Sequence, residues 1–109
     1  MLDLENIDFR ETSYPGVGIR FLRTDRDRGY AAVLIRMDPG SSYPRHRHKG
    51  FEEVFVLQGA FADEAGLHGE GESLRYEDGS VHAPRVPEDG ERCIFFAISQ
   101  EGIDLLDQA

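Results

Sequence analysis

Short apolar runs alternate with turn-forming residues through most of the chain, and this spacing predicts strands rather than helices. No stretch keeps a 3.6-residue apolar period long enough for a helix. Segments rich in Gly, Pro, Asp and Ser separate the runs, among them TDRDRG, DPGSS, DEAG and EDGS. Many short strands at close spacing are typical of a sandwich or a small barrel. The expected strands cover residues 18–22, 30–37, 43–48, 52–57, 72–76 and 92–99.

The two ends of the chain are weakly patterned. Residues 1–14 and 102–109 show no clear alternation of apolar and polar positions. We expect each end to be either a frayed tail or an arm that reaches a partner subunit.

Side-chain alternation predicts which polar residues of the stretch YPRHRHKGFEE share one face of a strand. On a strand, residues two apart share a face, so His46 and His48 project the same way. A Lys-Gly turn follows, and Glu52 then opens a strand on the face that carries Val54. We expect the Glu52 carboxylate to meet both imidazoles. Glu53 faces the opposite side.

Length, charge and cysteine content narrow the class of protein. The 109 residues fit a single domain. The formal charge of −9 disfavours binding to nucleic acid or to anionic lipid, and no apolar segment is long enough to span a bilayer. The acidic start MLDLENIDFR is unlike a secretory signal, so we expect a cytoplasmic protein. Since Cys93 is the lone cysteine, a metal bound by this chain must use histidine and carboxylate.

His82 adds a further candidate ligand. It follows a Gly-Ser turn in GESLRYEDGSVHAP, and no local structure explains it. Three of the four histidines and one glutamate therefore lie on segments that a barrel can bring together. Imidazole and carboxylate are the ligands that Zn, Fe, Ni and Mn sites use, so the spacing predicts a divalent metal site.

Two motifs carry a resemblance to the cupin family. The segment GSSYPRHRHKGFEEVFVLQG has every fixed position of the first cupin motif, at Gly40, His46, His48, Glu52 and Gly59. The second motif is met at Gly71, Gly79 and His82, with Glu77 in place of the usual proline and Val86 in place of an asparagine found in many cupins. The resemblance implies an all-β fold, the double-stranded β-helix or jelly-roll barrel. One domain then covers residues 1–109, with the barrel core at about 17–99.

Within the cupins, the segment LIRMDPGSSYPRHRHKGFEEVFVLQGAFADEAG is similar to the C-terminal domain of ChrR-type anti-sigma factors and to its stand-alone relatives. In those domains three histidines and a glutamate bind zinc. The resemblance thus implies zinc as the first candidate metal, with iron, nickel or manganese as alternatives, at His46, His48, Glu52 and His82. The anti-sigma activity of that family rests on a separate helical zinc domain, for which this chain has neither the length nor the cysteines. We therefore expect a sensor or small-ligand-binding module.

An enzymatic function is the alternative. Four protein ligands saturate a tetrahedral zinc ion, which leaves no position for substrate. An ion that prefers six ligands keeps two open positions, as a dioxygenase acting on small dicarbonyl or phenolic substrates requires. The acetylacetone-cleaving cupin dioxygenase resembles this chain in size, but its metal is held by histidines without the glutamate. The sequence identifies no catalytic residue.

Other residues receive less specific predictions. We expect His68, between glycines in DEAGLHGEG, to be an exposed histidine, with a supporting role near the site as the alternative. Cys93 is expected to be a buried thiol, and Arg36 and Tyr43 to serve surface or packing roles rather than ligand orientation.

The face opposite Glu52 predicts an oligomer. Phe51, Phe55 and Leu57 point away from the barrel interior by the same alternation and form an apolar patch. Small cupins resemble one another in dimerising through such surfaces. We therefore expect a homodimer.

Overall fold

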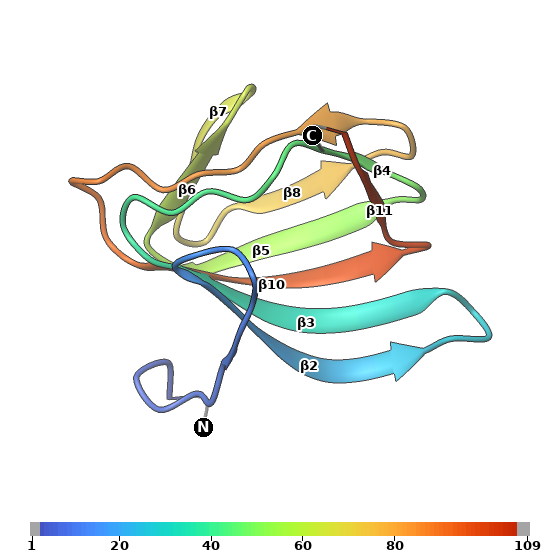
Figure 1. Cartoon of the computed structure of the whole chain (residues 1–109), viewed down its shortest axis with the longest axis horizontal. Helices are drawn as coiled ribbons and strands as arrows, with labels where there is room; N and C mark the ends of the chain where they lie inside the picture. The colour runs from blue at the N-terminus through green and yellow to red at the C-terminus, as the bar shows by residue number, and fades with distance from the viewer. Residues whose placement is uncertain (1–2, 107–109) are drawn as a thin grey trace.

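The computed structural model of the protein describes residues 3–106, which form strands and turns and no helix. The all-β prediction is confirmed (Figure 1). Within these residues no segment forms a helix that is long and apolar enough to cross a membrane. The strands are β1 (Arg10–Glu11), β2 (Val17–Asp25), β3 (Tyr30–Met37), β4 (His46–His48), β5 (Glu52–Gln58), β6 (Ala60–Asp63), β7 (Gly66–Gly69), β8 (Ser73–Tyr76), β9 (Val81–His82), β10 (Cys93–Gln100) and β11 (Ile103–Leu105).

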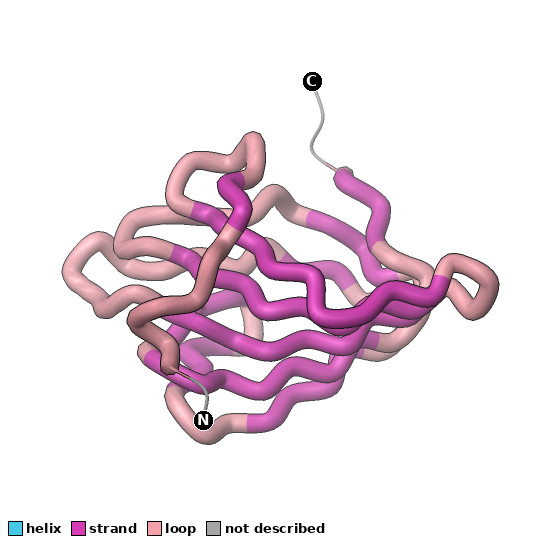
Figure 2. Tube along the Cα trace, turned by 90° about the horizontal axis from the view of Figure 1, so that it is seen from below, coloured by secondary structure: helices cyan, strands magenta, loops and turns pink. Residues whose placement is uncertain are grey.

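The largest sheet has six strands in the order β1-β2-β3-β10-β5-β8, and all of its neighbours are antiparallel. Its central strand, β10, lies between β3 and β5, so distant parts of the sequence pair there. Register shifts in the β2–β3 and β10–β5 ladders, which skip Leu22 and Leu57, mark bulges or irregularities of the pairing. Figure 2 shows these strands running side by side along the molecule.

The remaining strands form a second layer. It consists of a three-stranded sheet, β11-β4-β9, and a two-stranded hairpin, β6-β7, and among the described residues no strand of one pairs with a strand of the other. Isolated bridges join Arg85 to Ser42 and to Ala62, so backbone hydrogen bonds link the two pieces across this layer. Two facing antiparallel layers of this kind make a jelly roll.

The hydrophobic core lies between the two layers. From the large sheet, Val33, Val54 and Phe95 are buried, with exposed fractions of 8 % or less. From the second layer, Phe61 packs against them, and its ring centroid lies 5.2 Å from that of Phe95. The alternation expected for the strand that begins at Glu52 is present, since Val54 is buried while Phe55 is exposed.

The expected strands correspond to β2, β3, β4, β5, β8 and β10, with one main error of extent. The strand expected over residues 43–48 is only His46–His48. Pro44 has no backbone N–H and cannot take part in a ladder as a donor. The short strands β1, β6, β7, β9 and β11 were not predicted, because two to four residues carry too little periodicity.

Both ends of the chain join its own sheets, and the expectation of a free tail or a partner-directed arm is wrong for the described residues. Arg10 and Glu11 pair with β2. Near the other end, Ile103–Leu105 pairs with β4 in register Ile103↔His48 and Leu105↔His46. The C-terminal strand thus covers the outer edge of the histidine strand. Residues 1–2 and 107–109, which belong to the same expectations, lie outside the described residues.

Gly59 shows why one motif glycine is required. It ends β5 with a φ of +70°, a region that side chains other than glycine rarely adopt. A Cβ atom there would lie 2.3 Å from the carbonyl oxygen of Arg92. The turn therefore brings β5 and the start of β10 too close together for any side chain.

Candidate metal site

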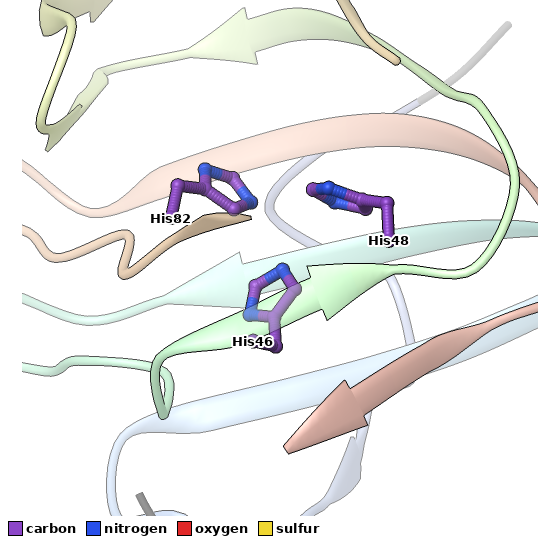
Figure 3. A group of neighbouring side chains, drawn as sticks. All are labelled: His46, His48 and His82. Carbon is purple, nitrogen blue, oxygen red and sulfur yellow. The ribbon is translucent and has the colours of Figure 1, made fainter. Parts of the chain in front are cut away.

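Three histidines meet between the layers. His46 and His48 come from β4, and His82 comes from β9, which pairs with β4 in register His46↔His82. The three ring centroids are 4.5 to 4.9 Å apart, and each residue is at most 6 % exposed. One nitrogen from each ring lies within 4.8 Å of the others. Figure 3 shows the three rings pointing toward one another. Three side chains at this distance could bind one metal ion.

Each of these rings is anchored through its Nδ1 atom. Nδ1 of His46 donates to the carbonyl oxygen of Pro44 at 2.9 Å, and Nδ1 of His82 donates to Oδ2 of Asp63 at 3.0 Å. Nδ1 of His48 lies 3.2 Å from the carbonyl oxygen of Ser80 and 3.1 Å from its hydroxyl oxygen. Carbonyl and carboxylate oxygens only accept, so Nδ1 carries the proton in His46 and His82. Nε2 is then the nitrogen that keeps a lone pair for a ligand.

Glu52 lies beside this cluster through a contact with His48. Its Oε1 atom is 3.1 Å from Nε2 of His48, and the Glu52 side chain is 17 % exposed. A carboxylate oxygen and an unprotonated ring nitrogen are both acceptors. The contact is therefore favourable only when a proton or a cation lies between the two atoms. This donor set of imidazole and carboxylate fits a divalent metal ion.

A buried aspartate that the sequence analysis did not select holds His82. The Asp63 side chain is 1 % exposed. Its Oδ2 accepts from the Tyr76 hydroxyl at 2.8 Å and from His82, and its Oδ1 accepts from His68 at 2.8 Å. Burial alone would raise the pKa of Asp63, but the bonds from His82, His68, Tyr76 and the Ala65 amide together lower it to about 2. Asp63 is thus a fully satisfied buried anion.

His68 is not the exposed histidine that was expected. It is 7 % exposed and tilts against Phe61, with 5.2 Å between ring centroids. Its Nε2 lies 2.8 Å from Asp63 and its Nδ1 lies 2.8 Å from Glu72. Burial would lower the pKa of His68, but hydrogen bonds to both carboxylates raise it above its usual value. Since His68 bonds Asp63 and Asp63 bonds His82, His68 lies close to the histidine cluster. The alternative expectation, a supporting role there, stays a prediction.

The signal for these residues was present but weak. In a hairpin turning at DEAG, Asp63 and His68 fall on facing strands, and Phe61 pairs directly with His68. Phe61, Asp63 and His68 then share one face of the hairpin. The sequence indicates that this face points inward only through Phe61, because an apolar aromatic side chain is usually buried.

Burial sets the proton state of two site histidines. Desolvation lowers the pKa of His46, and the nearby rings of His82 and His48 act in the same direction. Desolvation also lowers the pKa of His82 and outweighs the opposing hydrogen bond to Asp63. Both rings are therefore neutral at pH 7, which is the form that binds metal.

An apolar cavity of about 330 Å³ opens beside the histidines. His46, His82 and Glu52 line its polar end, and the side chains of Val33, Val54, Phe95 and other apolar residues line the rest. Phe21 also lines it and is 53 % exposed, so the cavity reaches the protein surface there. A cavity of this size suits a small molecule.

The structure also shows where Cys93, Arg36 and Tyr43 lie. Cys93 is completely buried as expected, and burial raises the pKa of its thiol to about 12. Arg36 forms a bidentate ion pair with Glu11, at 2.7 and 2.8 Å, and serves the terminal strand as a packing residue. Tyr43 packs edge-on against His46 at 5.4 Å and lines the cavity, so it is closer to the site than a surface residue would be.

The fold and the histidine cluster agree with a known family. The model of the ChrR cupin-like domain family matches residues 1–100. The chain belongs to this family. The resemblance found in the two motifs is therefore confirmed, and the ChrR-like cupin has the jelly-roll fold expected of it.

Two known proteins of the ChrR type are similar to the ChrR-like cupin in sequence or structure. It is 39 % identical over 66 residues to the anti-sigma-E factor ChrR of Cereibacter sphaeroides, covering 61 % of this chain and 30 % of that protein. A crystal structure of Rhodobacter sphaeroides SigE in complex with the anti-sigma ChrR matches with a TM-score of 0.76 and 32 % identity, over 90 % of this chain and 51 % of that one. The chain thus spans well under two thirds of these relatives.

An enzyme shares the same fold. The acetylacetone dioxygenase of Acinetobacter johnsonii superposes with a TM-score of 0.82 over 99 % of this chain and 76 % of its own, at 15 % identity. Likeness at this level of identity describes the fold alone.

Proposed function

We propose that the ChrR-like cupin is a divalent-metal-binding module in which His46, His48, His82 and Glu52 hold zinc. The observation that carries the proposal is the convergence of three buried imidazoles, each with one ring nitrogen within 4.8 Å of the others. Each ring is also anchored through its Nδ1 atom. Glu52 supplies negative charge beside His48. Three neutral nitrogens and one carboxylate match the ligand preferences of zinc.

Within this proposal the metal site serves a sensor or small-ligand-binding module in the cytoplasm, with a homodimer as its assembly. The likeness to an anti-sigma-E factor supports a regulatory role. The cavity of about 330 Å³ beside His46 and His82 supports a small molecule as the signal. A molecule bound in this cavity, next to the metal, would contact both sheet layers and could change how they pack.

The test is a metal analysis on protein purified without nickel affinity, followed by spectroscopy of the cobalt-substituted form. Bound zinc at one ion per chain, with a tetrahedral cobalt spectrum, supports the proposal. The variant His48→Ala should lose most of the metal, while Arg47→Ala on the opposite face of β4 should retain it. Equal metal content in both variants would contradict the ligand assignment.

A dioxygenase-like oxidoreductase is the second candidate, and the open apolar cavity beside the histidines favours it. A small dicarbonyl or phenol would fit this space beside His46 and His82. A six-coordinate ion bound by four protein ligands would retain two positions for oxygen and substrate. The iron-loaded protein should then consume O₂ with a 1,3-dicarbonyl or a catechol. Tetrahedral zinc with no turnover would leave the binding module as the better description.

A further inference from the structure

Asp63, on the β6-β7 hairpin, is the hydrogen-bond partner of the His82 side chain among the described residues. His82 lies on β9, which is two residues long and pairs with β4 at only two positions. A strand this short fixes its side chains weakly. The 3.0 Å bond from Nδ1 of His82 to Asp63 is the side-chain hydrogen bond that orients the ring, which also packs against Tyr76 at 4.2 Å between centroids.

Asp63 is an unusual residue to place in this position if packing were its only purpose. Its side chain is 1 % exposed, and burying a carboxylate costs free energy unless charge and hydrogen bonds compensate. The compensation is complete, because Asp63 accepts from His68, Tyr76, the Ala65 amide and His82. The donors from the hairpin and from Tyr76 fix the carboxylate, and His82 is the partner that faces the candidate metal site.

His68 supplies the balancing charge. Its two ring nitrogens face two carboxylates, Asp63 and Glu72, each at 2.8 Å. Since carboxylates only accept, both nitrogens must donate, and the ring is an imidazolium. The chain Glu72–His68–Asp63–His82 is thus a continuous line of charge-assisted hydrogen bonds that begins at the surface and ends at the site.

We propose that Asp63 is a positioning residue for the metal site, which fixes the orientation and the Nδ1–H form of His82, and that His68 holds Asp63 in place. The inference rests on the proposed metal-binding function. A carboxylate behind a ligating imidazole selects the tautomer and strengthens the other nitrogen as a ligand, and its loss typically lowers metal affinity about 10- to 100-fold. Asp63 reaches the proposed ligand set only through its bond to His82, and His68 reaches it only through Asp63.

The first test compares Asp63→Asn with Asp27→Asn. The asparagine keeps the size of the side chain but cannot accept from all four donors. Asp27 is an exposed loop residue, so its variant makes the same charge change far from the site. Zinc affinity, measured by competition with a chelator, should fall about 10- to 100-fold in Asp63→Asn and stay unchanged in Asp27→Asn. A folded Asp63→Asn protein with wild-type zinc affinity would overturn the proposal, even if its thermal stability had fallen.

The second test needs neither a variant nor a metal. Nitrogen-15 NMR of the imidazole rings in metal-free wild-type protein reports the tautomer of each histidine. His82 should be protonated at Nδ1 and His68 at both nitrogens. An Nε2–H tautomer of His82 would overturn the inference, including in the case where Asp63→Asn fails to fold. If wild-type protein binds no zinc but shows the expected tautomers, the metal proposal fails while the positioning of His82 by Asp63 stands.

Discussion

Glu52 and Glu53 are adjacent in the chain, yet their carboxylates lie on opposite faces of the large sheet. Oε1 of Glu52 is 3.1 Å from Nε2 of His48, whereas Oε1 of Glu53 is 2.7 Å from the guanidinium of Arg75 at the surface. This relationship offers a matched pair of variants. Glu52→Gln removes the charge beside the histidines, and Glu53→Gln makes the same change outside the barrel.

We expect Glu52→Gln to weaken zinc binding by about ten-fold or more, because a neutral amide is a poorer ligand for a divalent ion than a carboxylate. Glu53→Gln should bind zinc as the wild type does. Chelator competition on both proteins measures the difference. Equal affinities would remove Glu52 from the ligand set and leave the three histidines.

Acid should destabilise the metal-free protein through its buried histidines. The folded-state pKa of His46 and His82 is lower than that of an unfolded histidine, about 6.5. The unfolded chain therefore binds more protons as the pH falls below about 6.5, and the free energy of unfolding decreases until the folded pKa values are passed. Urea unfolding between pH 7.5 and 5 checks the slope.

The control for this slope is His46→Asn, which removes one of the two titrating rings. His68 acts in the opposite sense, because its raised pKa gives stability below about 6.5 that is lost as the pH rises through the folded value. It is present in both proteins and cancels in the comparison. A variant slope as steep as that of the wild type would contradict the role of His46.

The homodimer remains a prediction. Phe55 is 43 % exposed on the outer face of the large sheet, where it pairs across the strand with Phe96. Phe51 is partly covered by Arg75, whose guanidinium carbon lies 4.4 Å from the ring centroid. We expect light scattering to give about twice the 12.3 kDa of one chain.

Phe55→Lys should shift the mass towards 12.3 kDa, because it places a charge in the apolar patch. Leu67→Lys is the matched control, since Leu67 is 64 % exposed on the β6-β7 hairpin, away from that patch. A wild-type mass of one chain at micromolar concentration would refute the prediction. Dimer loss in both variants would show that the patch was chosen wrongly.

Alanine variants of Gly59 and Gly71 distinguish the cost of backbone strain from the cost of steric overlap. Both have positive φ, +70° and +87°, but a Cβ at Gly59 meets the Arg92 carbonyl oxygen at 2.3 Å while nothing lies within 4 Å of one at Gly71. Gly71→Ala should cost about 1 to 2 kcal/mol of stability from the left-handed backbone alone. Gly59→Ala should cost more, because β5 and β10 must also move apart. Thermal or denaturant unfolding of both variants measures the difference, and equal losses would contradict the overlap.

The sequence by itself determined the strands that carry the core and the placement of three of the four candidate ligands. Period-two alternation is a local property, so it placed His46 and His48 on one face and separated Glu52 from Glu53 without knowledge of the fold. Two motif glycines, Gly40 in DPGSS and Gly79 in EDGS, marked turns because glycine favours them. His82 was selected by its residue type and by the family motif, since nothing local connects it to β4.

Tertiary structure decided what local pattern does not contain. His82 meets His46 because β9 pairs with β4, and β11 pairs with the other edge of β4 although the end of the chain has no clear alternation. Asp63 and His68 became part of the site's surroundings only when the β6-β7 hairpin packed beside β9. These contacts join residues distant in sequence, and their free energy comes from burial and hydrogen bonding between layers. Short polar segments carry no periodic signal of that pairing, so only the assembled layers reveal it.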